Sequence, residues 1–306
     1  MEPQHRDNVL TRLRKLLFSP HMPARYQLLR AIDRRFNVLS YQRKLDYLTV
    51  ERPFYGVGLL QAALLAKKLG KKTISAIEFG VAGGNGLVAL EQHAEAVKAE
   101  TGVAVTVYGF DTGTGMPPPQ DYRDMPYVFQ QGYFEMDVPA LRARLTSAQL
   151  VLGDVAQTLR DFADRDDVAP VGFISFDLDY YSSTVAALKI FDMDHHRLLP
   201  RVICYFDDTV GPVDEAYNEF TGELLAIKEF NAASEAMKIA PVNGLRFYGD
   251  HIPQWWHEQI LVAHLFGHPE YCTPINTHTQ LPLASGRPSQ SQKRAAAAMQ
   301  MAEKKV

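Results

Sequence analysis

Short runs of apolar residues alternate along this chain with longer stretches in which apolar residues recur every three or four positions. The short runs predict buried strands, and the longer stretches predict helices. The predicted strands span 73–79, 103–110, 150–152, 171–176 and 201–206, and a final pair spans 238–242 and 259–266. Helices are predicted at 58–68, 86–100, 139–148, 155–162, 183–191 and 215–237. Strands that alternate with helices in this way are typical of a doubly wound α/β fold with a mostly parallel sheet.

The two ends of the chain differ from this pattern. Residues 8–50 hold helical patterns with apolar stripes on Val9, Leu13, Leu16 and Leu17, and on Leu28, Leu29, Ile32 and Phe36. Such helices either cap a site or pack on the core, and the pattern does not decide between these roles. From Leu283 onward, Ser, Pro, Gln, Ala and Lys dominate, as is typical of a disordered tail. We therefore expect an N-terminal helical cap and lead-in helix over 1–70, an α/β domain over 71–282 and a tail over 283–306.

Composition narrows the class of protein. The 306 residues carry a formal net charge of -3, with 46% hydrophobic and 22% charged residues, as in soluble globular proteins. A dedicated nucleic-acid partner is disfavoured, because binding phosphates needs clustered Lys and Arg. Two cysteines, Cys204 and Cys272, predict no disulfide framework and favour a reducing compartment. Without a signal-peptide pattern or an apolar run long enough to span a bilayer, we expect a cytoplasmic chain with no membrane partner.

A glycine-rich turn follows the first predicted strand and contains Glu78, Gly80, Gly83, Gly84 and Gly86. Glycine lets a ligand approach the backbone, and the helix behind the turn offers free N–H groups. The spacing does not match the dinucleotide fingerprint G-x-G-x-x-G, and an ordinary turn between strand and helix is the alternative. The stretch resembles motif I of the class I S-adenosylmethionine (SAM) methyltransferases. That resemblance implies that the glycines line SAM and that Glu78 lies near its methionine end.

Two further aspartates stand where this cofactor would be bound. Asp111 closes the second strand, where an acidic side chain can accept hydrogen bonds from ribose hydroxyls. Asp154 follows the third strand; the resemblance places it near the adenine, and it is equally suited to cap the next helix. The long loop 112–131 lies between them, and we expect it to form a lid, because long loops in compact domains are usually functional or mobile.

Four carboxylates follow the fourth and fifth predicted strands, namely Asp177, Asp179, Asp207 and Asp208. Parallel strands bring their carboxyl ends to one edge of the sheet, so these side chains should converge. Like charges in one site repel each other, and a buried unpaired charge is costly. A hard cation such as Mg²⁺, which prefers oxygen ligands, would relieve this cost. Each aspartate taken alone is better explained as a helix cap or turn residue, and it is their combination that favours a metal.

A more specific resemblance rests on Asp177, Asp179, Tyr181, Ser183 and Thr184, followed by Asp207 and Asp208. The pattern is similar to the metal-dependent macrocin O-methyltransferases, which methylate sugar hydroxyls of antibiotics. It implies a Rossmann-like, seven-stranded methyltransferase sheet, Mg²⁺ on Asp177, Asp207 and Asp208, and Asp179 as general base. The segment 194–200 replaces the usual Gly-Gly turn of that family. Whether Asp177 or Asp179 is the metal ligand therefore stays open.

These features predict a SAM- and Mg²⁺-dependent O-methyltransferase of natural-product type. Its partner would be a small-molecule hydroxyl acceptor such as a sugar, a catechol or another vicinal diol. Methyl transfer needs alignment, and an alcohol needs a base or a metal to activate it. The alternatives are a catalytically silent SAM-binding scaffold and another Mg²⁺-dependent activity, such as hydroxylation, on the same fold. The identity of the acceptor and the formation of a homo-oligomer are left open by the sequence.

Overall fold

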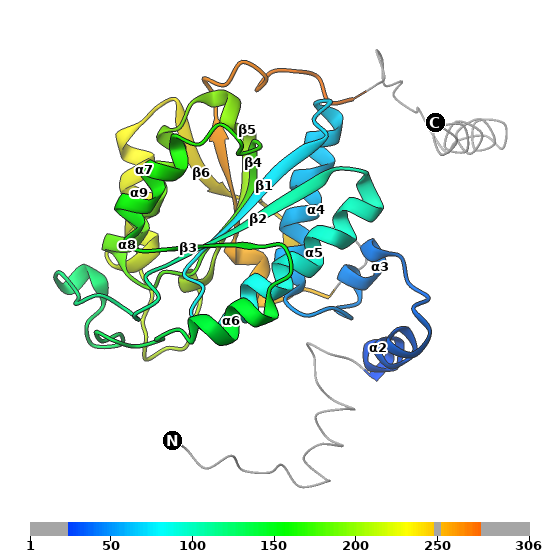
Figure 1. Ribbon diagram of the computed structural model, residues 1–306, viewed down its shortest axis with the longest axis horizontal. Coiled ribbons are helices and arrows are strands. Elements are labelled where there is room, and N and C mark those ends of the chain that lie inside the picture. The colour runs from blue at the N-terminus through cyan, green and yellow to red at the C-terminus, as the bar shows by residue number, and fades with distance from the viewer. Residues whose placement is uncertain (1–23, 248–251, 277–306) are drawn as a thin grey trace, which may run out of the picture. The chain divides into compact units, whose positions relative to one another are not determined.

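The computed structural model describes residues 24–247 and 252–276 and contains a seven-stranded sheet in the order β3-β2-β1-β4-β5-β7-β6 (Figure 1). The strands are β1 (Thr73–Phe79), β2 (Ala104–Asp111), β3 (Gln149–Leu152), β4 (Val171–Phe176), β5 (Leu198–Phe206), β6 (Met237–Pro241) and β7 (Ile260–Leu265). The first five strands are parallel, and β7 runs antiparallel to β5 and β6. The predicted α/β fold with a mostly parallel seven-stranded sheet is confirmed. This fold belongs to the unit Met1–Thr273, and a second unit begins at Pro274.

Helices cover both faces of the sheet. The described α-helices are α2 (Ala24–Phe36), α3 (Tyr41–Asp46), α4 (Pro53–Lys68), α5 (Asn85–Thr101), α6 (Val138–Arg144), α7 (Val155–Ala163), α8 (Tyr181–Leu188) and α9 (Gly222–Ala233). Figure 1 shows α4 and α5 on one face and α7, α8 and α9 on the other. A separate cluster of buried hydrophobic side chains lies on each face. None of the helices in the described part of the chain is long and apolar enough to cross a membrane.

Helix α4 packs closely on the sheet because small residues form its inner face. A Cβ atom on Gly58 would lie 2.4 Å from the ring of Phe173 in β4. Ala62 and Ala63 are fully buried on the same face. The predicted start of this helix at residue 58 was too late: it starts at Pro53, because proline fits the first turn of a helix.

The helix predicted at 215–237 is shorter than expected. It covers only Gly222–Ala233, and the chain before it forms a turn with Ala216 at φ 53. The Asn218 side chain donates to the Ala216 carbonyl at 2.8 Å and accepts from the Phe220 amide at 2.9 Å. Such local side-chain bonds compete with helix formation. Smaller corrections shift the predicted 183–191 to Tyr181–Leu188, and 139–148 to Val138–Arg144.

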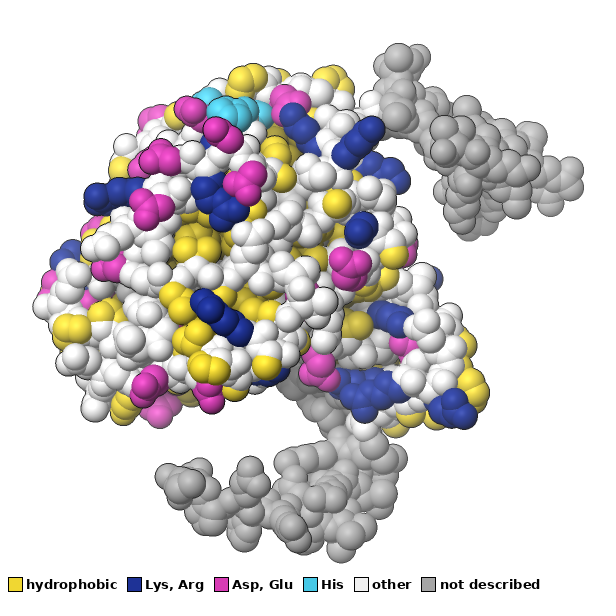
Figure 2. Space-filling view, in the orientation of Figure 1, with side chains coloured by type: hydrophobic (Ala, Val, Ile, Leu, Met, Phe, Trp, Pro, Cys, Tyr) yellow, Lys and Arg dark blue, Asp and Glu magenta, His cyan; other side chains and the backbone are white. Residues whose placement is uncertain are grey.

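The N-terminal helices are described only in part. The predicted second stripe lies on α2, but its residues Leu28, Ile32 and Phe36 are exposed. Figure 2 shows Lys and Arg side chains gathered over the same helix. Helix α2 is held instead through buried Tyr26, which packs edge-on against Tyr47 at 5.1 Å. The first stripe, with Val9, Leu13, Leu16 and Leu17, and the tail 283–306 lie outside the described residues.

Four buried phenylalanines stand side by side near the carboxyl ends of the central strands. They are Phe110, Phe79, Phe176 and Phe206, the residues paired across β2, β1, β4 and β5. Their ring centroids are 5.0, 5.5 and 4.4 Å apart in that order. This in-register row places the residues that follow each phenylalanine at one level: Gly80, Asp111, Asp177 and Asp207. We call it the phenylalanine row.

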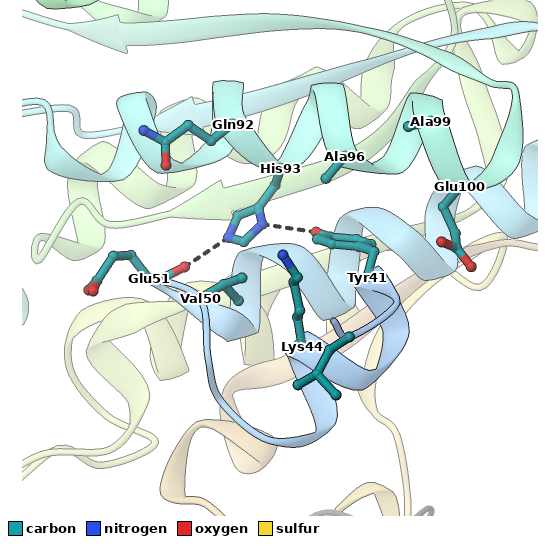
Figure 3. Close-up of a pocket in the computed structure, with 10 residues that line it drawn as sticks. Tyr41, Lys44, Val50, Glu51, Gln92, His93, Ala96, Ala99 and Glu100 are labelled. Carbon is teal, nitrogen blue, oxygen red and sulfur yellow. Dashed lines mark hydrogen bonds between the residues drawn. The ribbon is translucent and has the colours of Figure 1, made fainter. Parts of the chain in front are cut away.

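Buried His93 of α5 holds the chain that leads into α4 (Figure 3). Its Nε2 lies 2.9 Å from the carbonyl oxygen of Glu51 and 3.1 Å from that of Arg52. Carbonyl oxygens only accept, so Nε2 carries the proton and Nδ1 accepts from the Tyr41 hydroxyl at 2.9 Å. A cavity of about 350 Å³ lies beside this group, and its wall includes Lys44, Gln92 and Glu100.

We expect His93 to make folding stability depend on pH. Burial lowers the pKa of His93, whereas the unfolded side chain takes up its proton near about pH 6.5. Below that pH the unfolded state therefore binds more protons than the folded state. The free energy of unfolding then decreases as the pH is lowered, by at most about 1.4 kcal/mol per pH unit from this group. In urea unfolding at pH 7.5 and 5.5, the free energy of unfolding should decrease less between the two pH values for His93→Gln than for the wild type.

The exposed His196 supplies the control for this measurement. His196→Gln should keep the wild-type pH dependence. Equal pH dependence in His93→Gln and the wild type would contradict the assignment.

Candidate functional site

A cavity of about 550 Å³ lies at the carboxyl ends of the central strands. Its wall contains the residues that follow the phenylalanine row, namely Gly80, Asp111, Asp177 and Asp207. The loop after β2 supplies Thr112, Gly115, Met116, Pro117, Pro118 and Gln120. Doubly wound folds bind ligands in this crevice, and the volume is within the usual range for small-molecule sites.

Most glycines of the turn after β1 are required by close packing. Gly80 has φ 84, and a Cβ atom there would lie 1.7 Å from the carbonyl oxygen of Asp177. A Cβ atom on Gly84 would meet Leu141 at 2.1 Å, and one on Gly86 would meet Oε1 of Glu78 at 1.8 Å. Gly83 faces open space. Of these four glycines, Gly80 is the one that lines the cavity. The glycine pattern that resembles a cofactor motif therefore also serves the close packing of the turn.

Glu78 lies behind the cavity wall, with 1% of its surface exposed. Its Oε1 accepts from the Tyr55 hydroxyl at 2.7 Å, and the Ser175 hydroxyl donates to the Tyr55 oxygen at 2.9 Å. Its Oε2 is buried with no hydrogen-bond partner among the described residues. Burial raises the pKa of Glu78 to about 8, partly offset by Tyr55 and Arg52. Sequence reasoning missed Tyr55 and Ser175, because single hydroxyls on a helix and a strand carry no recognisable spacing.

Asp111 organises the turn from the end of β2. Its Oδ2 accepts from the amides of Val81 and Ala82, both at 2.9 Å, and Oδ1 accepts from the Gly113 amide at 2.7 Å. A carboxylate offers about four acceptor positions, so room for another donor remains. Asp111 therefore joins the glycine turn to the loop after β2, and the predicted ribose contact stays a prediction.

Asp154 begins helix α7 at the far end of the cavity. Its Oδ1 accepts from the Ala156 amide at 2.7 Å, which is an N-cap hydrogen bond. Asp154, Val155 and Ala156 all line the cavity. The capping role is thus observed, while the adenine contact stays a prediction.

The four aspartates after β4 and β5 converge but do not face the cavity equally. Asp177, Asp179 and Asp207 line it and are half-buried. Burial and the charges of neighbouring carboxyl groups raise the pKa of Asp177 well above its usual range. Burial raises the pKa of Asp179 to about 9, with Asp208 and Asp207 adding to the effect. Burial and mutual repulsion thus favour the protonated forms of Asp177 and Asp179, and a cation bound beside them would offset this effect.

Asp208 lies behind the other three and is 6% exposed. Its Oδ2 accepts from the Asp179 amide at 2.9 Å, and Oδ1 accepts from the Tyr217 hydroxyl at 3.2 Å. Its own amide donates to Glu223, whose Oε1 is buried without a partner among the described residues. Burial raises the pKa of Asp208 to about 7. Asp208 thereby holds Asp179, which has the left-handed φ of 57.

The four aspartates after β4 and β5 suit a hard cation by their chemistry, since they offer oxygen ligands whose negative charges repel one another. Within residues 24–247 and 252–276, no group of three His, Cys, Asp or Glu side chains is arranged to hold a metal ion. Mg²⁺ at Asp177, Asp207 and Asp208 therefore stays a prediction, as does the choice between Asp177 and Asp179 as ligand.

The loop 112–131 is tied to the site by a buried carboxylate that sequence reasoning missed. Asp124, 1% exposed, accepts from the Ser182 amide at 2.8 Å, from the Ser182 hydroxyl at 2.9 Å and from the Gln120 amide at 2.8 Å. Ser182 lies in the first turn of α8, directly after Asp179 and Tyr180. Met125 and Phe129 of the loop pack with Tyr180 in a small hydrophobic cluster. The loop therefore forms a fastened wall of the cavity in this structure.

We expect Asp124→Asn to release this loop. The amide NH₂ must face a backbone N–H or the Ser182 hydroxyl, and a buried unsatisfied donor costs about 1–3 kcal/mol. Trypsin should cut after Arg123 faster than in the wild type, with the global unfolding transition little changed. Exposed Glu135→Gln, which removes a charge just beyond the same loop, serves as control. Equal cleavage rates in Asp124→Asn and the wild type would show that Asp124 does not fasten the loop.

Comparison with known proteins gave a likeness in structure only. No protein-family model matches the sequence, and no curated protein matches it. CalS11, a calicheamicin methyltransferase, is 22% identical, with 80% of this chain and 92% of that chain covered and a TM-score of 0.46. The O-methyltransferase NovP is 14% identical, with 63% and 77% covered and a TM-score of 0.44. The O-methyltransferase TomG from Streptomyces achromogenes is 14% identical, with 87% and 99% covered and a TM-score of 0.40.

Proposed function

We propose that this protein is a SAM-dependent O-methyltransferase that acts on a hydroxyl of a small molecule. The observation that carries the proposal is a single cavity that joins the turn after β1 to Asp111, Asp154 and the carboxyl groups after β4 and β5. The two ends differ in chemistry. One is formed by backbone turns and the N-terminus of α7, as suits a nucleoside, and the other is crowded with carboxyl groups, as suits a sulfonium and a hydroxyl.

The reaction needs little covalent help from the protein. The acceptor oxygen attacks the methyl carbon of the sulfonium, the carbon–sulfur bond breaks, and its electron pair stays on sulfur to give S-adenosylhomocysteine (SAH). Holding both reactants in line supplies much of the rate increase. The acceptor hydroxyl must also lose its proton, and Asp179 lines the cavity where it could accept it. Burial and neighbouring carboxyl groups raise the pKa of Asp179 to about 9, so a positive charge close by is needed to free its carboxylate for this role.

Mg²⁺ is part of the proposal. Asp177 and Asp207 would hold it from the cavity wall, with Asp208 behind them, and it would supply a Lewis acid that lowers the pKa of an acceptor hydroxyl. The chain's own contribution is to keep Asp179 oriented, through its amide bond to Asp208, and to exclude water beneath the loop 112–131.

The cofactor part is tested by calorimetric titration of SAH, with Mg²⁺ and with EDTA. We expect micromolar binding to the wild type. Ala156→Phe fills the cavity beside Asp154 and should weaken SAH binding at least tenfold, because the added ring occupies ligand volume. Ala143→Phe, on an exposed position of α6, should bind like the wild type. Absence of SAH binding to the wild type under both conditions would refute the methyltransferase assignment.

The catalytic part is tested by turnover with a panel of sugars, catechols and other vicinal diols. Asp179→Asn should lower kcat by about 100-fold or more while SAH binding is retained, because a general base contributes about 10²–10⁴-fold. Methyl transfer that persists in EDTA would refute the role of Mg²⁺. Product mass separates the alternatives: methylation adds a methyl group, hydroxylation adds an oxygen, and a silent SAM-binding scaffold consumes no cofactor.

A further inference from the structure

Arg52 stands directly before α4 in a backbone conformation that the fold must hold in place. Its φ of 44 and ψ of 59 are left-handed, and Pro53 follows as the first helical residue. This conformation costs a non-glycine residue about 1–2 kcal/mol. His93 donates to the Glu51 and Arg52 carbonyls at 2.9 and 3.1 Å and so fixes this stretch (Figure 3). The point from which the Arg52 side chain departs is therefore set by the buried core.

The Arg52 guanidinium lies over two aromatic rings that lead to the site carboxyl groups. It is 5.4 Å from the ring centroid of Tyr55 and 6.0 Å from that of Phe54. The Tyr55 hydroxyl donates to Glu78 at 2.7 Å. The Phe54 ring stacks on Tyr205 at 4.5 Å, and the Tyr205 hydroxyl donates to Asp207 at 2.6 Å. These rings place the cation beside the site, on the face of the sheet that α4 covers.

The guanidinium makes no hydrogen bond and no ion pair with any described residue, although it is half-buried and has five N–H donors. Other arginines of the chain behave differently: Arg123 lies 2.8 Å from Asp121, and Arg165 lies 2.8 Å from Asp167. A side chain that only neutralised the site would be expected to close on a carboxylate in the same way.

The surrounding charges keep Arg52 positive. Burial acts to lower the pKa of Arg52, but Tyr55 and the carboxyl groups of Glu78, Asp177 and Asp207 outweigh it and raise the pKa. Arg52 is thus a cation whose N–H donors are not used by any residue that the structure describes. A guanidinium fork matches the two oxygens of a carboxylate or phosphate better than any other side chain does.

We propose that Arg52 is the oxyanion-binding residue of this site and receives a carboxylate or phosphate group of a bound ligand. Two ligands of the proposed reaction can carry such a group: the cofactor at its amino-acid end, and an acidic acceptor. In the second case Arg52 also selects the substrate, because an acceptor without the acidic group would leave the guanidinium unpaired. The choice between these sources rests on the proposed function, whereas the affinity of Arg52 for an oxyanion does not.

The test compares the wild type with Arg52→Gln, Arg52→Lys and the control Arg142→Gln, which removes the same charge from an exposed position of α6. Each protein is titrated with SAH, with 5′-methylthioadenosine, which lacks the amino-acid end, and with inorganic pyrophosphate as a plain oxyanion. Thermal unfolding followed by circular dichroism confirms that each variant is folded. Arg52→Lys keeps the charge without the fork and remains available if Arg52→Gln is unstable.

Binding to the cofactor carboxylate predicts that Arg52→Gln weakens SAH by about 10- to 100-fold and leaves methylthioadenosine unchanged. If Arg52 binds an acidic acceptor, Arg52→Gln should bind SAH as tightly as the wild type does and should bind pyrophosphate about 10- to 100-fold more weakly. In both cases the affinity of Arg52→Lys should lie between those of the wild type and Arg52→Gln, and the affinity of Arg142→Gln should equal that of the wild type. A wild type that binds pyrophosphate through Arg52 but no SAH would refute the methyltransferase and keep the oxyanion site. Equal behaviour of the wild type and Arg52→Gln toward both SAH and pyrophosphate, including no binding of either, would overturn the inference.

Discussion

The in-register pairing of parallel strands at the phenylalanine row is the constraint on which the site depends. The four rings fill the face covered by α7, α8 and α9, so a slip of one residue in any strand would turn a large apolar ring out of the core. Because the rings are fixed at one level, the residues after them are fixed as well. A glycine and three aspartates thereby meet at one edge of the sheet, although long stretches of sequence separate them.

The opposite face of the same strands carries buried polar side chains. Glu78, Ser175 and Tyr205 are paired neighbours one position before the row, and α4 covers them. The small residues of α4 allow its backbone to approach, which brings Tyr55 within hydrogen-bond distance of Glu78 and Ser175. A buried carboxyl group is costly unless it is bonded or protonated, and its raised pKa follows from this burial. A positive charge brought close to these buried acids would favour their ionised forms.

Segments outside the sheet complete the cavity through a few buried polar contacts. Asp124 fastens the loop 112–131 to the start of α8, Asp208 holds the Asp179 turn, and His93 holds the chain before α4. Each contact joins a side chain to backbone groups far away in sequence. Such bonds restrain loops that packing alone would leave mobile, because a buried polar group without its partner is expensive. The orientation of the candidate base Asp179 and the backbone position of Arg52 thus depend on contacts between segments that are distant in the sequence.

Much of the architecture is determined by the sequence alone. Periodicity gave the strands and their order along the chain, and the glycine turn with Asp111, Asp154, Asp177 and Asp207 at strand ends located the cavity. Local pattern failed where local bonds compete with it, as at Asn218, and where proline starts a helix rather than breaking one, as at Pro53. Only the tertiary structure decided that Asp208 and Glu78 lie behind the cavity wall and that Asp124 fastens the loop 112–131 to α8. It also decided that Arg52 lies over the ring of Tyr55 without a hydrogen bond to any described residue. These outcomes depend on contacts between distant segments, and periodicity records which face of an element is buried but not which side chain it meets there.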